Sequence, residues 1–224
     1  MKILALLALT TIAANAATSI NLDFGTSGTA PPSSYAAAGA PGTWNSAASL
    51  GLSPITGFVD TSGNPVGLGI MSSRSLFVVT PSSQPFSGPV ADLLGDYLVS
   101  TANDFTLTFS GLSPGVYRIF TYTVGRQDFP HSSTVTPFGD VSLATTNTGI
   151  WTGMLQERIT HSVHDLQVTS GGFTLDIFSS SDGFVNGIQI VQVPEPCFMS
   201  LLAVSFLVFG WTRKGVKPEV GFQA

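Results

Sequence analysis

Apolar and polar residues alternate along several short segments of this chain, and Gly, Pro, Asn and Asp clusters interrupt them. The clearest alternation lies in residues 104–110, where Phe105, Leu107 and Phe109 are separated by Thr residues. Successive side chains of a strand point to opposite faces of a sheet, so this pattern predicts a strand with one buried face. Residues 112–115 then turn the chain, and residues 116–124 form the returning strand of an expected hairpin.

The same plan recurs near the end of the body. Residues 173–177 alternate, a Ser/Asp/Gly turn follows, and a last strand runs through Ile188 and Ile190. Residues 19–24 and 75–80 are further candidate strands. Only residues 89–100 indicate a short helix, with Leu93, Leu94 and Tyr97 on one side. Residues 25–69 are rich in Gly, Ala, Pro and Ser and are expected to form a long irregular loop.

Short strands at close intervals with little helix predict an all-β body, an antiparallel β-sandwich over residues 18–193. The segment GLSPGVYRIFTY at 111–122, together with the late NGIQI at 186–190, resembles the jelly-roll class that includes galactose-binding-like and malectin-like modules. This resemblance concerns the fold and implies a jelly-roll-like sandwich.

Charge is scarce and mostly negative. Charged residues make up 9% of the chain, against about 25% in a typical soluble domain. Between residues 18 and 193 there are 11 acidic and 4 basic residues. A nucleic acid is therefore excluded as a partner, because phosphate binding requires a basic face. The single cysteine, Cys197, lies in a C-terminal apolar run, so neither an intramolecular disulfide nor a cysteine zinc site is expected. We interpret Cys197 as a small apolar residue rather than a lipid-attachment site.

The N-terminus has the pattern of a secretory signal peptide. Lys2 supplies the positive charge, residues 3–12 are mostly apolar, and the small residues Ala14 and Ala16 flank Asn15. The apolar stretch is shorter than the about 20 residues of a membrane span. We therefore expect residues 1–17 to be removed by signal peptidase.

The C-terminus begins with Pro194, Glu195 and Pro196, continues with the apolar run 197–211, and ends in a basic tail over 212–224. As a helix the run would be about 22 Å long, shorter than a hydrocarbon core of about 30 Å. Arg213 and Lys214 follow it directly, which predicts a cytoplasmic tail and an exported body by the positive-inside rule.

This tripeptide, apolar helix and basic cluster, in that order, resemble the PEP-CTERM sorting signal of exported bacterial proteins over residues 194–224. The resemblance implies recognition by an exosortase, a membrane enzyme of Gram-negative bacteria that produce extracellular polysaccharide. The tail departs from the usual PEP-CTERM pattern in two ways: its basic cluster has few residues, and it continues with the extension GVKPEVGFQA. Both departures concern the efficiency of processing. The alternative is a permanent single-span membrane anchor preceded by a linker.

Two motifs resemble catalytic or metal-binding sites. Gly111, Ser113 and Gly115 match the G-x-S-x-G pattern of serine hydrolases, but a strand rather than a helix follows, and a turn explains these residues. His161 and His164, with Asp165 beside them, are three residues apart on an expected strand, so the two rings face opposite sides. We interpret both histidines as ordinary polar residues at a strand end. No catalytic residue and no metal-binding residue is assigned.

Structural Ca²⁺ is the one cofactor considered, and the expectation is that the chain has none. Asp92 and Asp96 are four residues apart in the helix-like segment, so both carboxylates would share one face. Further acidic residues lie near strand ends or turns, but no Ca²⁺ loop spacing is present, and turn formation is the default explanation. These residues are Asp23, Asp128, Asp140 and Asp182.

Several aromatic residues are candidates for stacking on a sugar: Tyr35, Trp44, Tyr97, Tyr122 and Trp151. Most aromatic residues of a sandwich fill its core. Trp44 and Trp151 lie in loop-like surroundings, so they are the preferred candidates for contact with a glycan.

Taken together, these patterns predict a non-enzymatic protein of the cell envelope or extracellular matrix, exported and sorted through its tail. The expected partners are signal peptidase, an exosortase and the membrane. The alternative is a carbohydrate-binding module that acts on surface polysaccharide. A secreted hydrolase is the third hypothesis, and it lacks a supported nucleophile.

Overall fold

The computed structural model describes residues 18–26, 28–81, 85–125, 131–179 and 182–194. The predicted signal peptide (1–17) and nearly all of the predicted sorting tail, including Glu195, Pro196, Arg213 and Lys214, lie outside these residues. Contacts divide the chain into two units, Met1–Val193 and Pro194–Ala224, and the described strands all belong to the first. No helix within the described ranges is long and apolar enough to cross a membrane.

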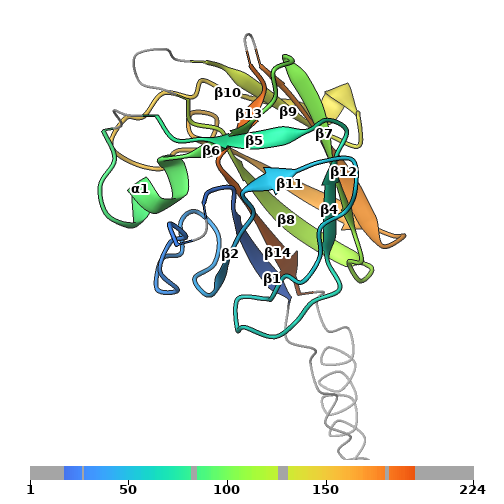
Figure 1. Ribbon diagram of the computed structural model, residues 1–224. Helices are drawn as coiled ribbons and strands as arrows, with labels where there is room; N and C mark the ends of the chain where they lie inside the picture. Colours follow the sequence, from blue (N-terminus) through green and yellow to red (C-terminus); the bar gives the residue numbers. More distant parts are fainter. Residues whose placement is uncertain (1–17, 27, 82–84, 126–130, 180–181, 195–224) are drawn as a thin grey trace, which may run out of the picture. The chain divides into compact units, whose positions relative to one another are not determined.

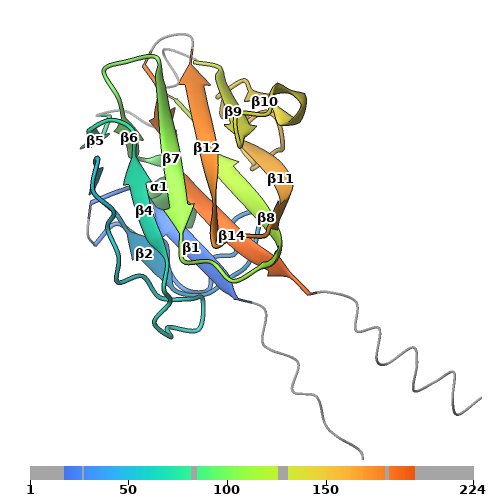
Figure 2. The same cartoon turned by 90° about the vertical axis from the view of Figure 1, so that its right-hand side faces the viewer.

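Two five-stranded sheets and one four-stranded sheet make up the body. The first sheet has the order β11 (His161–Val168), β8 (Gly115–Tyr122), β14 (Gly187–Val193), β1 (Ser19–Asp23) and β2 (Trp44–Ser46). The second sheet has the order β10 (Thr145–Asn147), β9 (Ser133–Pro137), β12 (Gly172–Ser179), β7 (Asp104–Ser110) and β4 (Gly69–Ser72). Figure 2 looks onto β4, β7 and β12 of the second sheet, with β14 and β8 behind them.

The small sheet, as we call the four-stranded one, has the order β13 (Phe184–Val185), β6 (Tyr97–Val99), β5 (Leu76–Val79) and β3 (Ser49–Leu50). One α-helix, α1 (Pro89–Leu94), precedes β6, and a 3₁₀ turn, η1 (Val141–Leu143), follows β9. Figure 1 shows the small sheet beside α1 at one end of the sandwich. All strand pairs are antiparallel except β1 with β2.

The inward faces of all three sheets form one hydrophobic core. Alternate residues of each long strand contribute to it, as the period-2 pattern predicts. Ile188 and Ile190 of β14 and Leu107 of β7 are fully buried in this core, and Leu98 of β6 joins it from the small sheet. The predicted antiparallel β-sandwich is therefore confirmed, with strands at 19–23 and 76–79 where residues 19–24 and 75–80 were expected.

The two expected hairpins are wrong. Strand β7 lies in the second sheet, whereas β8 lies in the first, so residues 111–114 carry the chain from one sheet to the other. The same holds for β12 and β14. A strand that alternates toward a shared core has the same sequence pattern in a hairpin and in a sheet-to-sheet connection, because in both cases one face is buried.

The helix prediction was partly right. Helix α1 buries Leu93 and Leu94 as expected but ends at Leu94, and Tyr97 belongs to β6. Asp96 therefore does not share a helix face with Asp92. The predicted loop 25–69 contains the short strands β2 and β3, and Trp44 is the first residue of β2.

Buried polar side chains fix part of this loop on the outer face of the first sheet. Gln189 of β14 accepts a hydrogen bond from the Tyr122 hydroxyl (2.6 Å) and donates to the Asn21 side chain (2.8 Å). Its amide nitrogen also donates to the carbonyls of Ala36 and Ala40. Because unpaired buried polar groups are costly, this network holds the segment 36–40 firmly in place.

Candidate functional site

A cleft lies over the outer face of the small sheet and has a volume of about 540 Å³. Both faces of this sheet carry apolar side chains. Leu76 and Leu98 point into the main core, while their neighbours Phe77, Tyr97 and Val99 line the cleft. Small-molecule sites typically occupy about 300–1,000 Å³, so the cleft has the size of a ligand site.

Strand register explains why these side chains meet. Val99 of β6 lies between Phe77 of β5 and Phe184 of β13, and Tyr97 lies opposite Val79. Directly paired residues of antiparallel strands share a face of the sheet. Two cross-strand rows, Phe77–Val99–Phe184 and Val79–Tyr97, therefore form the floor.

The floor contains both fixed and accessible aromatic rings. Tyr97 and Phe184 are buried and pack with ring centroids 5.4 Å apart, at an interplanar angle of 53°. Phe77 is 49% exposed, so a large part of its ring surface is open to a ligand. An exposed aromatic ring beside a buried aromatic pair forms an apolar platform.

Polar groups form the rim of this platform. Ser100, Thr101, His131 and Asp182 line the cleft together with the floor residues. His131 packs edge-on against Phe184 at 6.2 Å between ring centroids. Asp182 is exposed, so its carboxylate can accept hydrogen bonds from a ligand.

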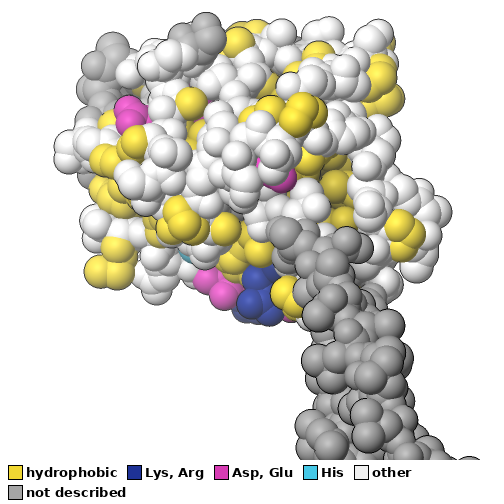
Figure 3. All heavy atoms as spheres, turned by 90° about the horizontal axis from the view of Figure 1, so that it is seen from below, with side chains coloured by type: hydrophobic (Ala, Val, Ile, Leu, Met, Phe, Trp, Pro, Cys, Tyr) yellow, Lys and Arg dark blue, Asp and Glu magenta, His cyan; other side chains and the backbone are white. Residues whose placement is uncertain are grey.

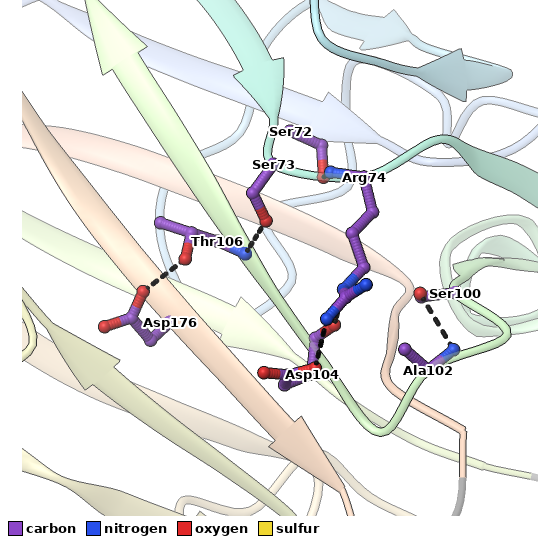
Figure 4. Close-up of polar contacts among 8 residues, drawn as sticks. All are labelled: Ser72, Ser73, Arg74, Ser100, Ala102, Asp104, Thr106 and Asp176. Atoms are coloured by element: carbon purple, nitrogen blue, oxygen red, sulfur yellow. Dashed lines mark hydrogen bonds and ion pairs between the residues drawn. The ribbon is translucent and has the colours of Figure 1, made fainter.

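Hydrogen bonds to the backbone hold one side of the rim. The Ser100 hydroxyl accepts a hydrogen bond from the Ala102 amide at 3.1 Å, drawn in Figure 4. The Ser100 amide in turn donates to the Gly183 carbonyl at 2.9 Å, next to Asp182. The segments after β6 and before β13 are thereby joined.

An ion pair fixes the entry to β5. Arg74 donates to the Asp104 carbonyl (2.9 Å) and to its carboxylate (3.0 Å), and Figure 4 shows both groups at the start of β7. The Ser73 hydroxyl accepts from the Thr106 amide, and the Thr106 hydroxyl donates to Asp176 at 2.6 Å. These contacts anchor the segment that leads to Phe77 against the second sheet.

The cleft carries little charge. Among the described lining residues there is no Lys or Arg, and Asp182 is the only carboxylate. The face seen in Figure 3 likewise carries few charged side chains: scattered yellow apolar side chains lie on a mostly white surface, and dark-blue cationic side chains lie beside magenta acidic ones. This lining suits a neutral ligand with an apolar face better than a phosphate or a carboxylate.

The two tryptophans predicted to contact a glycan lie elsewhere, in a second apolar cluster. Trp44 is only 7% exposed, and its indole nitrogen donates to the Tyr35 carbonyl at 3.1 Å. Trp151 is half-buried and packs edge-on against Phe86 at 5.4 Å between centroids. Glycan contact by Trp44 or Trp151 stays a prediction.

Of the remaining aromatic candidates, Tyr35 and Tyr122 lie in the second apolar cluster, and Tyr97 lies in the cleft. Tyr35 stacks on Trp44 at 6.3 Å, and burial of Tyr122 raises its pKa. Tyr97 is the one predicted aromatic candidate in the cleft. Phe77 and Phe184 were not predicted, although the uninterrupted apolar run 76–79 was the available signal, because it implies a strand that is apolar on both faces.

The catalytic and histidine motifs have structural explanations. Ser113 is exposed in the connection between β7 and β8, and its carbonyl accepts from the Tyr117 hydroxyl at 2.9 Å. His161 and His164 of β11 face opposite sides, as predicted. His161 is at the start of the strand, as expected, whereas His164 lies inside it. Both rings are buried, and burial lowers the pKa of each.

The acidic candidates are widely scattered. Asp140 caps η1 by accepting from the Ser142 amide at 2.9 Å, whereas Asp182 lines the cleft, and Asp128 lies outside the described residues. Asp23 and Asp96 lie close together beside Gly25. No group of three or more His, Cys, Asp or Glu residues gathers at one point in the part of the chain that the structure describes.

No protein-family model matches the chain, and no curated protein matches its sequence. Among solved structures, the chain is similar to a family 35 carbohydrate binding module from Clostridium thermocellum, with 12% identity and a TM-score of 0.36. That match covers 55% of this chain and 92% of the module.

Two further solved structures match part of the chain. The first is the CBM36-1 domain of a multidomain xylanase from the hindgut metagenome of Trinervitermes trinervoides (10% identity, TM-score 0.30, 55% of this chain and 96% of that one). The second is an exo-beta-1,3-galactanase from Phanerochaete chrysosporium (17% identity, TM-score 0.31, 55% of this chain and 26% of that one). At these TM-scores the matches assign neither a family nor a ligand, and the fold described above rests on the strand topology.

Proposed function

We propose that this protein binds carbohydrate without catalysis, and that the cleft over the small sheet is the binding site. The observation that carries the proposal is the exposed Phe77 ring on an apolar floor with a polar rim. A pyranose ring presents C–H groups on its faces and hydroxyls around its edge. A flat aromatic platform surrounded by hydrogen-bonding groups matches both features.

The rim supports the choice of a neutral sugar. Thr101 carries an exposed hydroxyl, and Asp182 offers an exposed carboxylate that accepts hydrogen bonds from sugar hydroxyls. An anionic sugar would meet the charge of Asp182 with no Lys or Arg among the described lining residues to offset it. We therefore place neutral glycans ahead of uronic acids and sulfated sugars.

The experiment is a glycan array probed with the full-length protein, with neutral and acidic polysaccharides side by side. The proposal predicts binding to a subset of the neutral glycans. Binding to none of the glycans, with and without added calcium, contradicts it. Binding to the acidic glycans alone would contradict the choice of a neutral ligand.

The cellular setting proposed for this activity is the outer side of the bacterial envelope. The signal-peptide pattern of residues 1–17 and the Pro194–Glu195–Pro196 motif, with its apolar run and basic tail, support export and sorting by an exosortase. An exported module that binds neutral polysaccharide would act at the cell surface or in the extracellular matrix.

A further inference from the structure

Two buried carboxylates lie where β1 ends and β6 begins, outside the cleft. Asp23 is the last residue of β1 and is 0% exposed, and Asp96, directly before β6, is 3% exposed. Among the residues that the structure describes, neither oxygen of Asp23 has a hydrogen-bond partner, and Oδ1 of Asp96 has none either. Unpartnered buried polar atoms are rare in folded proteins, and three on two neighbouring carboxylates require an explanation.

Both carboxylates point at the same small space in front of Gly25. A Cβ atom placed on Gly25 would lie 2.6 Å from both oxygens of Asp96 and 2.9 Å from Oδ2 of Asp23. Gly25 is buried and has no left-handed φ, so its backbone would accept alanine. The glycine is therefore explained by the space it leaves free rather than by its conformation.

The surroundings do not neutralise this pair. From the described part of the chain, Asp96 receives two long hydrogen bonds on Oδ2, from the Thr26 amide (3.3 Å) and the Thr29 hydroxyl (3.5 Å). The charged groups that act on Asp23 are Asp96 and Asp92, both of them acidic. Two described arginines, Arg74 and Arg118, form ion pairs with Asp104 and Asp165 instead.

We propose that Asp23 and Asp96 hold a divalent cation of the Ca²⁺ type in the space kept free by Gly25. Carboxylate oxygens are the ligands that hard cations prefer, and Ca²⁺ accepts about six to eight oxygens in irregular geometry. The two aspartates supply the charge, and backbone carbonyls or water supply the other ligands. The cation would join the end of β1 to the start of β6. The first residue of β6, Tyr97, lies in the floor of the cleft.

The test compares calcium binding by the full-length protein and by matched variants. After treatment with a chelator, thermal unfolding is followed with and without about 1 mM Ca²⁺, and binding is titrated by calorimetry. Gly25→Ala fills the space, and Asp23→Asn removes a carboxylate ligand without changing the shape of the side chain. Gly51→Ala is the control for the first, because nothing lies within 4 Å of its Cβ position, and Glu157→Gln is the control for the second, because this exposed carboxylate is not among the charges that act on Asp23.

We expect Ca²⁺ to raise the melting temperature of the wild type and of both controls by about 5 °C. In Gly25→Ala and Asp23→Asn we expect the shift and the heat of binding to be lost. A wild type that shows neither overturns the proposal and leaves a carboxyl pair that shares a proton. If Gly25→Ala and Asp23→Asn keep the wild-type shift in melting temperature, the proposal is also overturned, because the cation then binds elsewhere.

If Asp23→Asn does not fold, Asp96→Asn serves as the alternative variant, because it removes the other carboxylate ligand. The inference does not depend on the proposed glycan binding. A protein that binds Ca²⁺ but no glycan would leave the cation site in place and contradict only the proposed function.

Discussion

Tyr97 and Phe184 pack against one another across β6 and β13, with ring centroids 5.4 Å apart, and form the buried floor of the cleft. Their positions are set by the register of three short strands, which places Val99 between Phe77 and Phe184. The floor is therefore part of the folded framework, whereas the exposed Phe77 ring is free to serve a ligand.

The buried ring of Phe184 and the exposed ring of Phe77 should respond differently to truncation. Phe184 is 2% exposed, so Phe184→Ala is expected to lower the free energy of unfolding by about 3–5 kcal/mol. Phe77 is half exposed, so Phe77→Ala should cost about 1 kcal/mol or less. Urea denaturation of the two variants measures this difference. Equal losses would mean that Phe77 is a core residue and not a platform.

Gly111 is predicted to be irreplaceable for stability rather than for chemistry. Its φ is +80°, and a Cβ there would collide with the Gly67 carbonyl. Gly111→Ala is expected to destabilise the fold by about 1–3 kcal/mol from the strained backbone alone, and the contact with the Gly67 carbonyl adds to this loss. Ser113→Ala, two residues away and exposed, should leave stability within about 0.5 kcal/mol of wild type. Chemical denaturation checks both, and a stable Gly111→Ala would contradict the account.

His161 and His164 should make the fold less stable in acid. Burial lowers the pKa of each ring below its ordinary 6.5, and Glu157 opposes this for both. The unfolded chain then binds protons at a higher pH than the folded chain. The stability these residues contribute is present above about pH 6.5 and is lost as the pH falls through the folded values.

Asp23 affects the pH dependence of stability in the opposite direction to the two histidines, so the measurement must separate the two contributions. Burial and the nearby Asp96 raise its pKa to about 9, so without a bound cation its contribution grows as the pH falls from 9 toward 4. The measurement is therefore the difference in unfolding free energy between wild type and His161→Gln or His164→Gln from pH 7.5 to 5. A difference that does not change with pH would contradict the assignment to these rings.

The two ends of the chain carry a separate prediction. Intact-mass analysis of protein from the native envelope should show loss of residues 1–17 and of the segment beyond Pro194–Glu195–Pro196. Cleavage there would make residues 197–211 a transient sorting signal. A chain that still ends at Ala224 would favour the permanent anchor instead.

The hydrophobic pattern was sufficient to predict the fold class. Phe105, Leu107 and Phe109 do face the core, as do Ile188 and Ile190. Which sheet each strand joins was not predictable, because β7 and β8 alternate toward one shared core from opposite sides. Periodicity reports the buried face of a strand and carries no information about its neighbour.

The candidate site was harder to predict for a related reason. Tyr97 was among the candidates, but its partners come from three strands whose pairing depends on long-range register. Trp44 was preferred because its surroundings look like a loop, yet it lies in β2 and is covered by Tyr35. Asp23 and Asp96 are far apart in sequence, and only the fold shows that both face Gly25.

The most direct test of the central claim compares Phe77→Ala with Phe178→Ala. Phe178 is a matched control, since it is 54% exposed on β12 and does not line the cleft. Each protein is titrated by calorimetry with the neutral glycan that the wild type binds best. We predict that Phe77→Ala binds at least about tenfold more weakly, a loss of about 1.4 kcal/mol, while Phe178→Ala binds like wild type. Wild-type affinity in Phe77→Ala would contradict the claim that the cleft over the small sheet is the binding site.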